Sequence, residues 1–264
     1  MAEIITSSQN NFVKKLRELN DRKVRDTQRK LLAEGPKLVE EALKEGLTPF
    51  EALIEESRLS SLADTAHALS DKGAEVKLCS AQVLRSIGET RTPQGIAVSF
   101  SMPAPFDIKK EPSLIAALDG VQDPGNVGGI WRTADAAGFG AVLFSDGCAD
   151  PMSPKVIRSA MGSAFRLPAL CSTDFVQDLI TLRERGFRII VSALDGEDFF
   201  TAMPGKNEKC VLVIGSEGHG IRPSVRECAT DVLRLPMQGG AESLNANVAA
   251  GIMLYSLSFE LRRG

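Results

Sequence analysis

The sequence predicts an α/β protein whose larger, C-terminal part is built on a mainly parallel sheet. Two observations predict this class: short apolar runs alternate with helical patterns after residue 113, and a smaller α/β region precedes them. A Pro-rich stretch separates the two parts, so we expect a first domain at 1–102, a linker at 103–112 and a second domain at 113–264. Both domains have the length needed to bury a core of their own.

The first domain opens with two amphipathic helical patterns. One apolar face is formed by Phe12, Val13, Leu16 and Leu19. A second helix is expected after Gly35, because Pro36 suits a first helical turn, where its missing N–H would have no partner. Apolar runs at 52–54 and 96–100 predict strands. Together these elements indicate a small α/β domain.

The second domain alternates more regularly. Three prolines, Pro103, Pro105 and Pro112, with charged residues between them, predict the linker before it. The predicted strands, each bounded by Gly or Asp, are 114–118, 141–144, 188–191 and 210–214. The predicted helices are 127–137, 175–185 and 244–261. Parallel strands need such helical crossovers, so the alternation predicts a parallel sheet.

Composition excludes several classes of protein. The five cysteines are dispersed and form no Cys-x-x-Cys pair, and the chain has only two histidines. This set fits neither a disulfide framework nor a zinc site, and it favours reduced thiols, so we expect a cytoplasmic protein without a metal. No apolar stretch approaches the ~20 residues of a membrane span, and the N-terminal residues lack a secretory signal pattern.

The net charge of −3 excludes a non-specific polycation, but it hides a local imbalance. Residues 1–30 carry eight basic and four acidic side chains. The basic ones are Lys14, Lys15, Arg17, Arg22, Lys23, Arg25, Arg29 and Lys30. Two interpretations stay open for this run: contacts to nucleic-acid phosphates, or the solvated face of a helix with mixed charge.

Three Gly-rich loops follow predicted strands, at the edge where parallel sheets bind ligands. They span 119–132, 214–221 and 235–245. The first lacks the Gly-x-Gly-x-x-Gly spacing of a dinucleotide site, and in the second Ile221 and Arg222 stand where a phosphate-binding loop needs Lys and Ser or Thr. Glycine that merely permits a tight turn explains any one loop, but three polar loops at strand ends favour a binding site.

The three loops resemble the signature motifs of the SpoU (TrmH-type) branch of the SPOUT RNA 2′-O-ribose methyltransferases. The first resembles Asp-Pro-x-Asn-x-Gly-x-x-x-Arg, from Asp123 to Arg132. The second resembles Gly-Ser-Glu-Gly-x-Gly, at 215–220, and the third resembles a Pro-Met…Ser-Leu-Asn motif, at 235–249. The resemblance covers 113–264, and more weakly the front, where Glu34-Gly35 and residues 92–95 resemble the domain that often precedes this one.

The resemblance implies a C-terminal SPOUT domain with a deep trefoil knot, preceded by a ribosomal-protein-like domain that binds the RNA substrate. It also implies S-adenosyl-L-methionine as cofactor and a homodimer formed through the knotted domain. Leu254, Leu257 and Leu261 of the last predicted helix would lie in that dimer interface or in the core. Position by position, the expected cofactor contacts are Gly215, Leu235 and Leu244, with Met237 nearby.

The same resemblance points to Arg132 as the catalytic residue. An arginine is an unusual base because it normally stays protonated. It would either lose a proton transiently beside a substrate phosphate, or bind that phosphate and stabilise the developing alkoxide while another group takes the proton. Asn126 is expected to orient Arg132 or the ribose, or else to cap the following helix. Glu217 is expected to pair with Arg132, or else to be a surface acid.

Ser243 and Asn245 complete the expected site. They would position the hydroxyl or the knot, although Ser243 would alternatively cap the last helix. For RNA contacts we expect Lys155 and Arg158, which share a helical face, together with Arg22 and Arg29 of the basic run; a solvated face is the alternative for the helical pair.

The predicted function is methylation of a ribose 2′-hydroxyl in RNA, with ribosomal RNA as the favoured substrate. The alternatives are a tRNA 2′-O-methyltransferase, an rRNA methyltransferase that gives antibiotic resistance, and, from a different class, a catalytically inactive RNA-binding protein.

Overall fold

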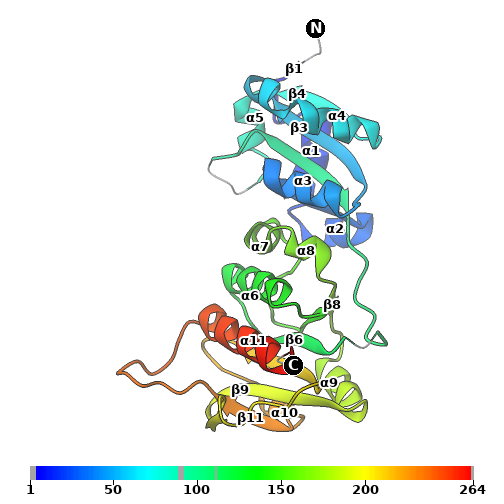
Figure 1. Ribbon diagram of the computed structural model, residues 1–264. Helices are drawn as coiled ribbons and strands as arrows, with labels where there is room; N and C mark the ends of the chain where they lie inside the picture. The colour runs from blue at the N-terminus through cyan, green and yellow to red at the C-terminus, as the bar shows by residue number, and fades with distance from the viewer. Residues whose placement is uncertain (1–3, 89–91, 111, 263–264) are drawn as a thin grey trace. The chain divides into compact units, whose positions relative to one another are not determined.

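The computed structural model of the chain describes residues 4–88, 92–110 and 112–262, so residue 111 of the expected linker lies outside the described residues. The chain forms two compact units (Figure 1). The first contains Met1–Pro103 together with Met152–Phe165, and the second contains Ala104–Pro151 together with Arg166–Gly264. Each unit has its own sheet.

The first unit is built on a mixed five-stranded sheet with the order β1-β4-β3-β5-β2. Strand β5 runs antiparallel to both of its neighbours, whereas the other pairs are parallel. The strands are β1 (Ile4–Ile5), β2 (Lys30–Glu34), β3 (Pro49–Glu55), β4 (Glu75–Cys79) and β5 (Ile96–Ser101). The helices are α1 (Asn11–Glu18), α2 (Arg22–Gln28), α3 (Pro36–Lys44), α4 (Ala63–Asp71), α5 (Ala81–Arg85) and α7 (Pro154–Ala160), with 3₁₀ turns at Glu56–Arg58 and Ser60–Leu62.

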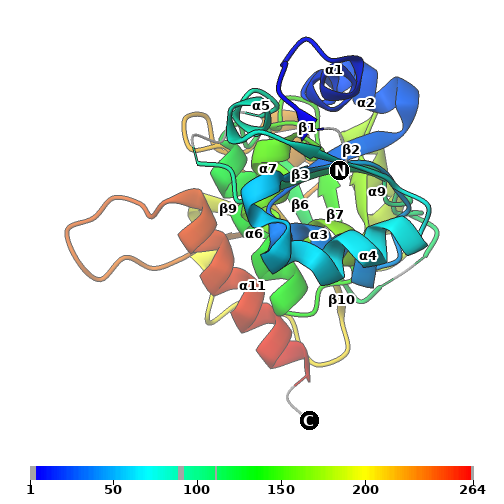
Figure 2. The same cartoon turned by 90° about the horizontal axis from the view of Figure 1, so that it is seen from above.

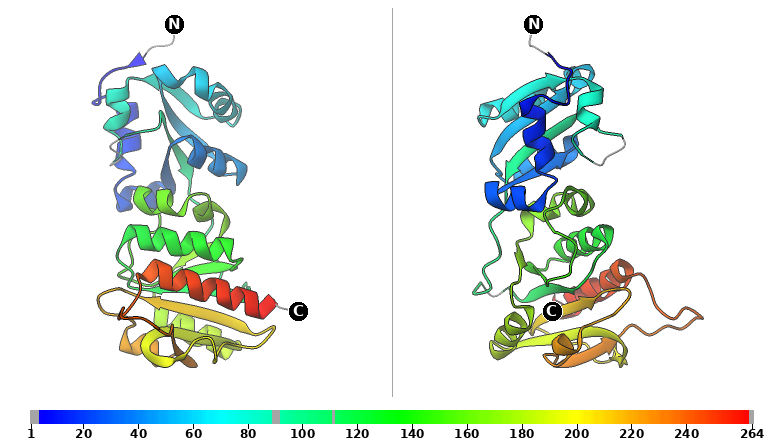
Figure 3. Two further views of the ribbon diagram at one scale, coloured as in Figure 1. Left: turned by 60° about the vertical axis from the view of Figure 1, so that its left-hand side comes forward. Right: turned by 180° about the vertical axis from the view of Figure 1, so that it is seen from behind.

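Helices cover both faces of this sheet. Figure 3 shows α1 on one side of the strands and α3 and α4 on the other. The apolar face predicted for the first helix is buried against Leu32, Leu53 and Ala97 of the strands. Pro36 occupies the first turn of α3, as expected. Strands β1, β2 and β4 were not predicted.

The second unit contains six strands, all parallel, in the order β11-β9-β10-β6-β7-β8. The strands are β6 (Leu114–Asp119), β7 (Ala141–Phe144), β8 (Ala169–Cys171), β9 (Phe187–Asp198), β10 (Lys209–Gly215) and β11 (Asp231–Arg234). The helices are α6 (Pro124–Ala136), α8 (Ser163–Arg166, at the boundary with the first unit), α9 (Phe175–Glu184), α10 (Pro223–Arg226) and α11 (Ala246–Arg262). The predicted parallel sheet is confirmed, whereas the short strands β8 and β11 were not predicted.

Two helical layers enclose the central strands of this sheet. Side chains of α9 and α10 pack with one face of β6, β7, β9 and β10 in a single apolar cluster. On the other side α6 and α11 lie side by side (Figures 1 and 2). Leu254, Leu257 and Leu261 of α11 are buried, so they belong to the core rather than to an exposed face.

Two further features bear on the expectations drawn from the sequence. Phe106, within the stretch expected to be a linker, is buried in the core of the second unit. None of the helices that the structure describes is long and apolar enough to cross a membrane. The trefoil knot stays a prediction.

Close packing of α6 on α11 requires a glycine at position 129. A Cβ atom there would lie within 2.5–2.8 Å of the Asn247 side chain on α11. Gly251, on α11, is a matched control, because a Cβ there would meet only Thr133 Cγ2, at an ordinary contact distance of 3.7 Å.

We predict that Gly129→Ala lowers the free energy of unfolding by about 1–3 kcal/mol, the usual cost of overpacking. Gly251→Ala should leave it unchanged or raise it by up to about 1 kcal/mol, because alanine favours the helix. Urea denaturation of both variants tests this. Equal effects of the two substitutions would contradict the tight contact at Gly129.

Candidate active site

The predicted site residues gather at the carboxyl ends of β6 and β10. These strands are adjacent and parallel, and their register places Asp119 opposite Gly215. The loop that leads into α6 follows β6, and the Gly-rich loop 215–222 follows β10. The segment between β11 and α11, drawn in orange and projecting from the body of the unit in Figures 1 and 2, supplies the third part.

Asn126 lies at the start of α6, where local hydrogen bonds fix its position. The cap of α6 is Asp123, whose carboxylate accepts from the Asn126 backbone N–H at 2.9 Å, and Pro124 occupies the first turn. The alternative that Asn126 itself caps the helix is therefore wrong. Its side-chain amide instead reaches outward and connects the two other motif loops.

The side-chain amide of Asn126 forms the centre of a short polar chain. Its Nδ2 donates to the Glu217 carboxylate, and its Oδ1 accepts from Asn245 Nδ2 at 3.3 Å. Asn245 also caps α11, since its Oδ1 accepts from the backbone N–H groups of Asn247, at 3.0 Å, and Val248, at 3.4 Å. One residue from each motif is thus joined through Asn126, and Asn245, not Ser243, caps the last helix.

Arg132 lies apart from this chain. Its side chain is exposed and makes no hydrogen bond or ion pair with any residue that the structure describes. The expected pair with Glu217 is not formed. Glu217 binds Asn126 instead, and Arg132 lies six positions beyond Asn126 on α6. That separation is about 9 Å along the helix axis and places the two side chains on different faces of α6. The guanidinium is therefore available to bind an external anion.

A cavity of about 660 Å³ opens beside Glu217 and Asn245. All the expected cofactor contacts line it, namely Gly215, Leu235, Met237 and Leu244, together with Ser243. The volume lies within the usual range of small-molecule sites, and the lining combines apolar side chains with a few polar groups. These residues fit an adenosyl cofactor, with its apolar contacts on the leucines and Met237 and polar contacts at the loop backbone.

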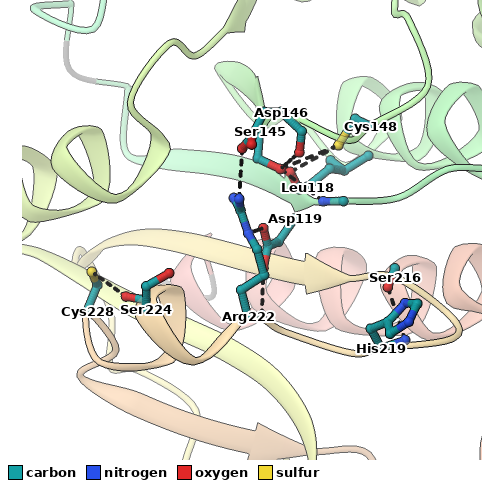
Figure 4. Close-up of polar contacts among 11 residues, drawn as sticks. Leu118, Asp119, Ser145, Asp146, Cys148, Ser216, His219, Arg222, Ser224 and Cys228 are labelled. Atoms are coloured by element: carbon teal, nitrogen blue, oxygen red, sulfur yellow. Dashed lines mark hydrogen bonds and ion pairs between the residues drawn. The ribbon is translucent and has the colours of Figure 1, made fainter.

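Gly215 is required by the tight turn that forms one wall of this cavity. Ser216 and Gly220 exchange two backbone hydrogen bonds, of 2.9 and 3.1 Å, which close the loop between them. A Cβ atom at Gly215 would clash with the Gly220 backbone. His219 lies at the exposed tip of this loop, where its N–H donates to Ser216 Oγ (Figure 4).

A cluster that the sequence did not reveal lies beneath the same loop. The Arg222 side chain donates from Nε to buried Asp119 at 2.6 Å and from Nη1 to exposed Asp146 at 2.8 Å (Figure 4). We call these three residues the Arg222 cluster. Asp119 ends β6, whereas Asp146 and Arg222 follow β7 and β10, so the parallel order of these three strands brings them together. The local signal in the sequence was an Asp at the end of β6 and another shortly after β7.

The thiol of Cys148 is a structural neighbour of this cluster. It donates to the Leu118 carbonyl at 3.3 Å, and burial raises its pKa despite weak hydrogen bonds from Ser145 and the nearby backbone. A thiol with a raised pKa is a poor nucleophile, which favours a structural role for Cys148. No group of three metal-ligating side chains occurs in the described parts of the chain.

The four residues expected to contact RNA all belong to the first unit. Lys155 and Arg29 are exposed. Arg22 is exposed but pairs with Asp26 at 3.6 Å on the same helix. Arg158 pairs with Glu34 at 3.4 Å, so its charge is partly neutralised within the unit. Of the helical pair, therefore, Lys155 is the more accessible cation.

Comparison with known proteins places this site in a family. Residues 113–255 match the SpoU rRNA Methylase family, and residues 10–98 match the MRM3-like substrate binding domain. The chain is 36% identical, over 96% of its own length and 98% of the relative's, to "23S rRNA (guanosine(2553)-2′-O)-methyltransferase RlmP" of Bacillus subtilis (strain 168). It is 31% identical, over 72% of its length and 81% of the relative's, to "23S rRNA (guanosine-2′-O-)-methyltransferase RlmB" of Salmonella typhi.

Solved structures agree with the sequence matches. The AdoMet-bound rRNA methyltransferase from Sinorhizobium meliloti superposes with a TM-score of 0.82 at 32% identity, and the alignment covers 99% of this chain and 98% of that one. The likeness therefore extends over both units and includes a structure that holds the cofactor. The chain belongs to the SpoU rRNA methylase family and is an S-adenosylmethionine-dependent RNA 2′-O-ribose methyltransferase.

Proposed function

We propose that the protein methylates the ribose 2′-hydroxyl of a guanosine in 23S ribosomal RNA. The observation that carries the proposal is the polar chain Glu217–Asn126–Asn245, which joins the three motif loops at the edge of one cavity. Both relatives named above act on guanosines of this RNA by their names, which supports the same substrate class here. A ribosomal substrate would place the enzyme in the cytoplasm.

The cofactor supplies an activated methyl group on a sulfonium, so the protein must mainly align the acceptor hydroxyl with that group. We assign the cofactor contacts to Gly215, Leu235, Met237 and Leu244, which share the cavity wall. The chain Glu217–Asn126–Asn245 would hold the loops that border the methyl group, and Ser243, exposed at the rim, would contact the ribose.

Arg132 is our candidate catalytic residue. The exposed side chain has no partner among the described residues, so the N–H groups of the guanidinium are available to a substrate phosphate. A guanidinium binds phosphate oxygens with two parallel hydrogen bonds and would hold the nucleotide beside the cavity. Its positive charge would also stabilise the alkoxide that develops as the hydroxyl loses its proton.

We assign RNA binding and methyl transfer to the two domains expected from the sequence. Residues 1–102, together with Lys155 and Arg158, would bind the RNA, residues 103–112 would connect, and the rest of 113–264 would carry out the methyl transfer. Exposed Arg29 and Lys155 are the strongest candidates for phosphate contacts, whereas Arg22 and Arg158 would have to exchange Asp26 and Glu34 for the RNA. The match to a substrate-binding domain over residues 10–98 supports this assignment.

A homodimer through the second unit is the assembly we propose. Helix α11 buries its leucines, yet it exposes Val248, Ile252 and Tyr255, with exposed fractions of 51%, 39% and 53%. The spacing of four and three residues places the three on one helical face. Phe259 continues the same face, with 66% exposed. Apolar faces of this kind on a surface helix are typical of protein interfaces.

The alternative functions differ from the proposed one in the RNA that is bound or in the loss of catalysis. A tRNA substrate or a role in antibiotic resistance would use the same site and differ only in the RNA that is bound. A catalytically inactive RNA-binding protein is disfavoured by the intact polar chain and by the accessible Arg132.

Methylation mapping of RNA tests the proposed function. In cells that lack the gene, we expect one guanosine of 23S rRNA to lose its ribose methyl group. The wild-type gene should restore it, and Arg132→Ala should not. Because Arg132 is exposed, the purified variant should keep the wild-type melting temperature and affinity for S-adenosylmethionine. Loss of a tRNA methyl group would favour the alternative substrate, and loss of no methyl group would refute the proposal.

The proposed dimer predicts that charge on the α11 face separates the subunits. Ile252→Glu combined with Tyr255→Glu should convert the protein to a monomer in analytical ultracentrifugation, because two buried carboxylates would oppose association. Gln177→Glu, at an exposed position of α9, is the control and should leave the assembly unchanged. A wild-type protein that sediments as a monomer at micromolar concentration would contradict the proposal.

The cavity wall predicts opposite outcomes for two neighbouring glycines. Gly215→Ala should abolish binding of S-adenosylmethionine and destabilise the fold by about 1–3 kcal/mol, because its Cβ would displace the Gly220 backbone. Gly218→Ala should preserve stability, since a Cβ there meets nothing within 4 Å. Calorimetric titration and thermal denaturation measure the two effects. Wild-type cofactor affinity in Gly215→Ala would remove this turn from the binding site.

A further inference from the structure

We propose that Arg222 is a positioning residue for the cofactor pocket: by binding Asp119 and Asp146 it holds the loop that carries Gly215 and Glu217. This inference concerns the cofactor pocket, so it does not depend on which RNA is the substrate. The role rests on the contacts of the Arg222 cluster, all within the second unit (Figure 4).

The first step is the contact between Arg222 and Asp119. The carboxylate of Asp119 accepts from the Arg222 backbone N–H at 2.8 Å and from Nε at 2.6 Å. The Asp119 side chain is fully buried, with 0% exposed. A buried carboxylate is costly unless it is paired and hydrogen-bonded, so Asp119 strongly favours one placement of residue 222.

The second step is the position of Asp119 in the sheet. Asp119 ends β6 directly opposite Gly215, the last residue of β10. Arg222 therefore ties the far end of loop 215–222 back to the strand beside its beginning. The backbone bonds between Ser216 and Gly220 close the same loop from inside. Both ends of loop 215–222 are thus fixed, and the exposed carboxylate of Glu217 lies between them.

The third step is the second carboxylate. Arg222 Nη1 donates to Asp146 at 2.8 Å, in the loop that follows β7. Asp146 is 80% exposed, so this bond adds less than the one to Asp119. Burial alone would lower the pKa of Arg222, but the two carboxylates outweigh that effect and raise it. Arg222 therefore stays charged and joins the ends of three strands.

A rigid loop matters here because residues 214–221 all line the cavity. A binding loop that must be ordered by the ligand reduces affinity by the cost of ordering it, whereas a loop held in place beforehand does not. Asp119 also lies only four residues before the α6 cap Asp123. The same ion pair thus supports the loops that carry Glu217 and Asn126, whose side chains are hydrogen-bonded.

The experiment compares two double variants that each remove a paired Arg and Asp. Asp119→Asn with Arg222→Met removes both charges, so no unpaired charge stays buried. The control is Arg188→Met with Asp231→Asn, which removes an Arg–Asp pair near the starts of β9 and β11, away from the cavity, where Arg188 also donates to Glu208. The third variant, Arg222→Lys, keeps the charge but loses the planar fork of donors.

We expect Asp119→Asn/Arg222→Met to weaken S-adenosylmethionine binding by about tenfold or more, as calorimetric titration measures it, because the loop is no longer held in place. The KM for the cofactor should rise in parallel, while the KM for RNA stays near the wild-type value. The control pair should lower the melting temperature without changing cofactor affinity. Arg222→Lys should give intermediate affinity and the wild-type melting temperature.

Two results would overturn the proposal. One is cofactor affinity within twofold of wild type in both Asp119→Asn/Arg222→Met and Arg222→Lys. The other is an equal loss of affinity in the control pair, which would show a general effect of lower stability. Should the double variant fail to fold, Arg222→Lys decides alone, because it leaves the charge of Asp119 compensated.

Discussion

The register between β6 and β10 is the constraint on which the rest of the site depends. Parallel pairing puts the carboxyl ends of both strands at one edge, and this register sets Asp119 beside Gly215. The loop to α6 and the loop 215–222 therefore leave the sheet side by side, so that Asn126 and Glu217 meet although 91 positions separate them. A shift of β10 by one residue would separate Asp119 from Gly215 and exchange the side chains that β10 buries on its two faces.

An asparagine is well suited to the central position that this register creates. Its amide offers a donor to the Glu217 carboxylate and an acceptor to Asn245 at the same time. An aspartate would place two carboxylates in contact, and a serine would not span both partners. Because Asn245 also caps α11, the start of that helix is tied to the start of α6. The close approach at Gly129 and Asn247 continues this contact along the two helices.

Much of this arrangement was predictable from the sequence, because each motif places its functional residues within one loop. The parallel sheet and the three loops follow from local patterns, and the residues around the cavity follow from the resemblance of these loops to the family motifs. The Arg222 cluster does not, since its bonds join residues 103 and 76 positions apart and depend on strand order. The prediction of a Glu217–Arg132 pair was wrong for a similar reason. The motif determines which residues are present, whereas the helix geometry of α6 determines which of them lie close together.

Helix α11 links the proposed assembly to the cofactor pocket. It is apolar on nearly all sides, with Met253, Leu254 and Leu257 buried and Val248, Ile252 and Tyr255 exposed, and a helix that is apolar all round is normally buried. Its first residues, Ala246 and Ala249, line the same cavity as Asn245. Pairing of two such helices would therefore order the segment that holds Asn245 against Asn126. In the proposed dimer, association and a complete cofactor site would favour each other.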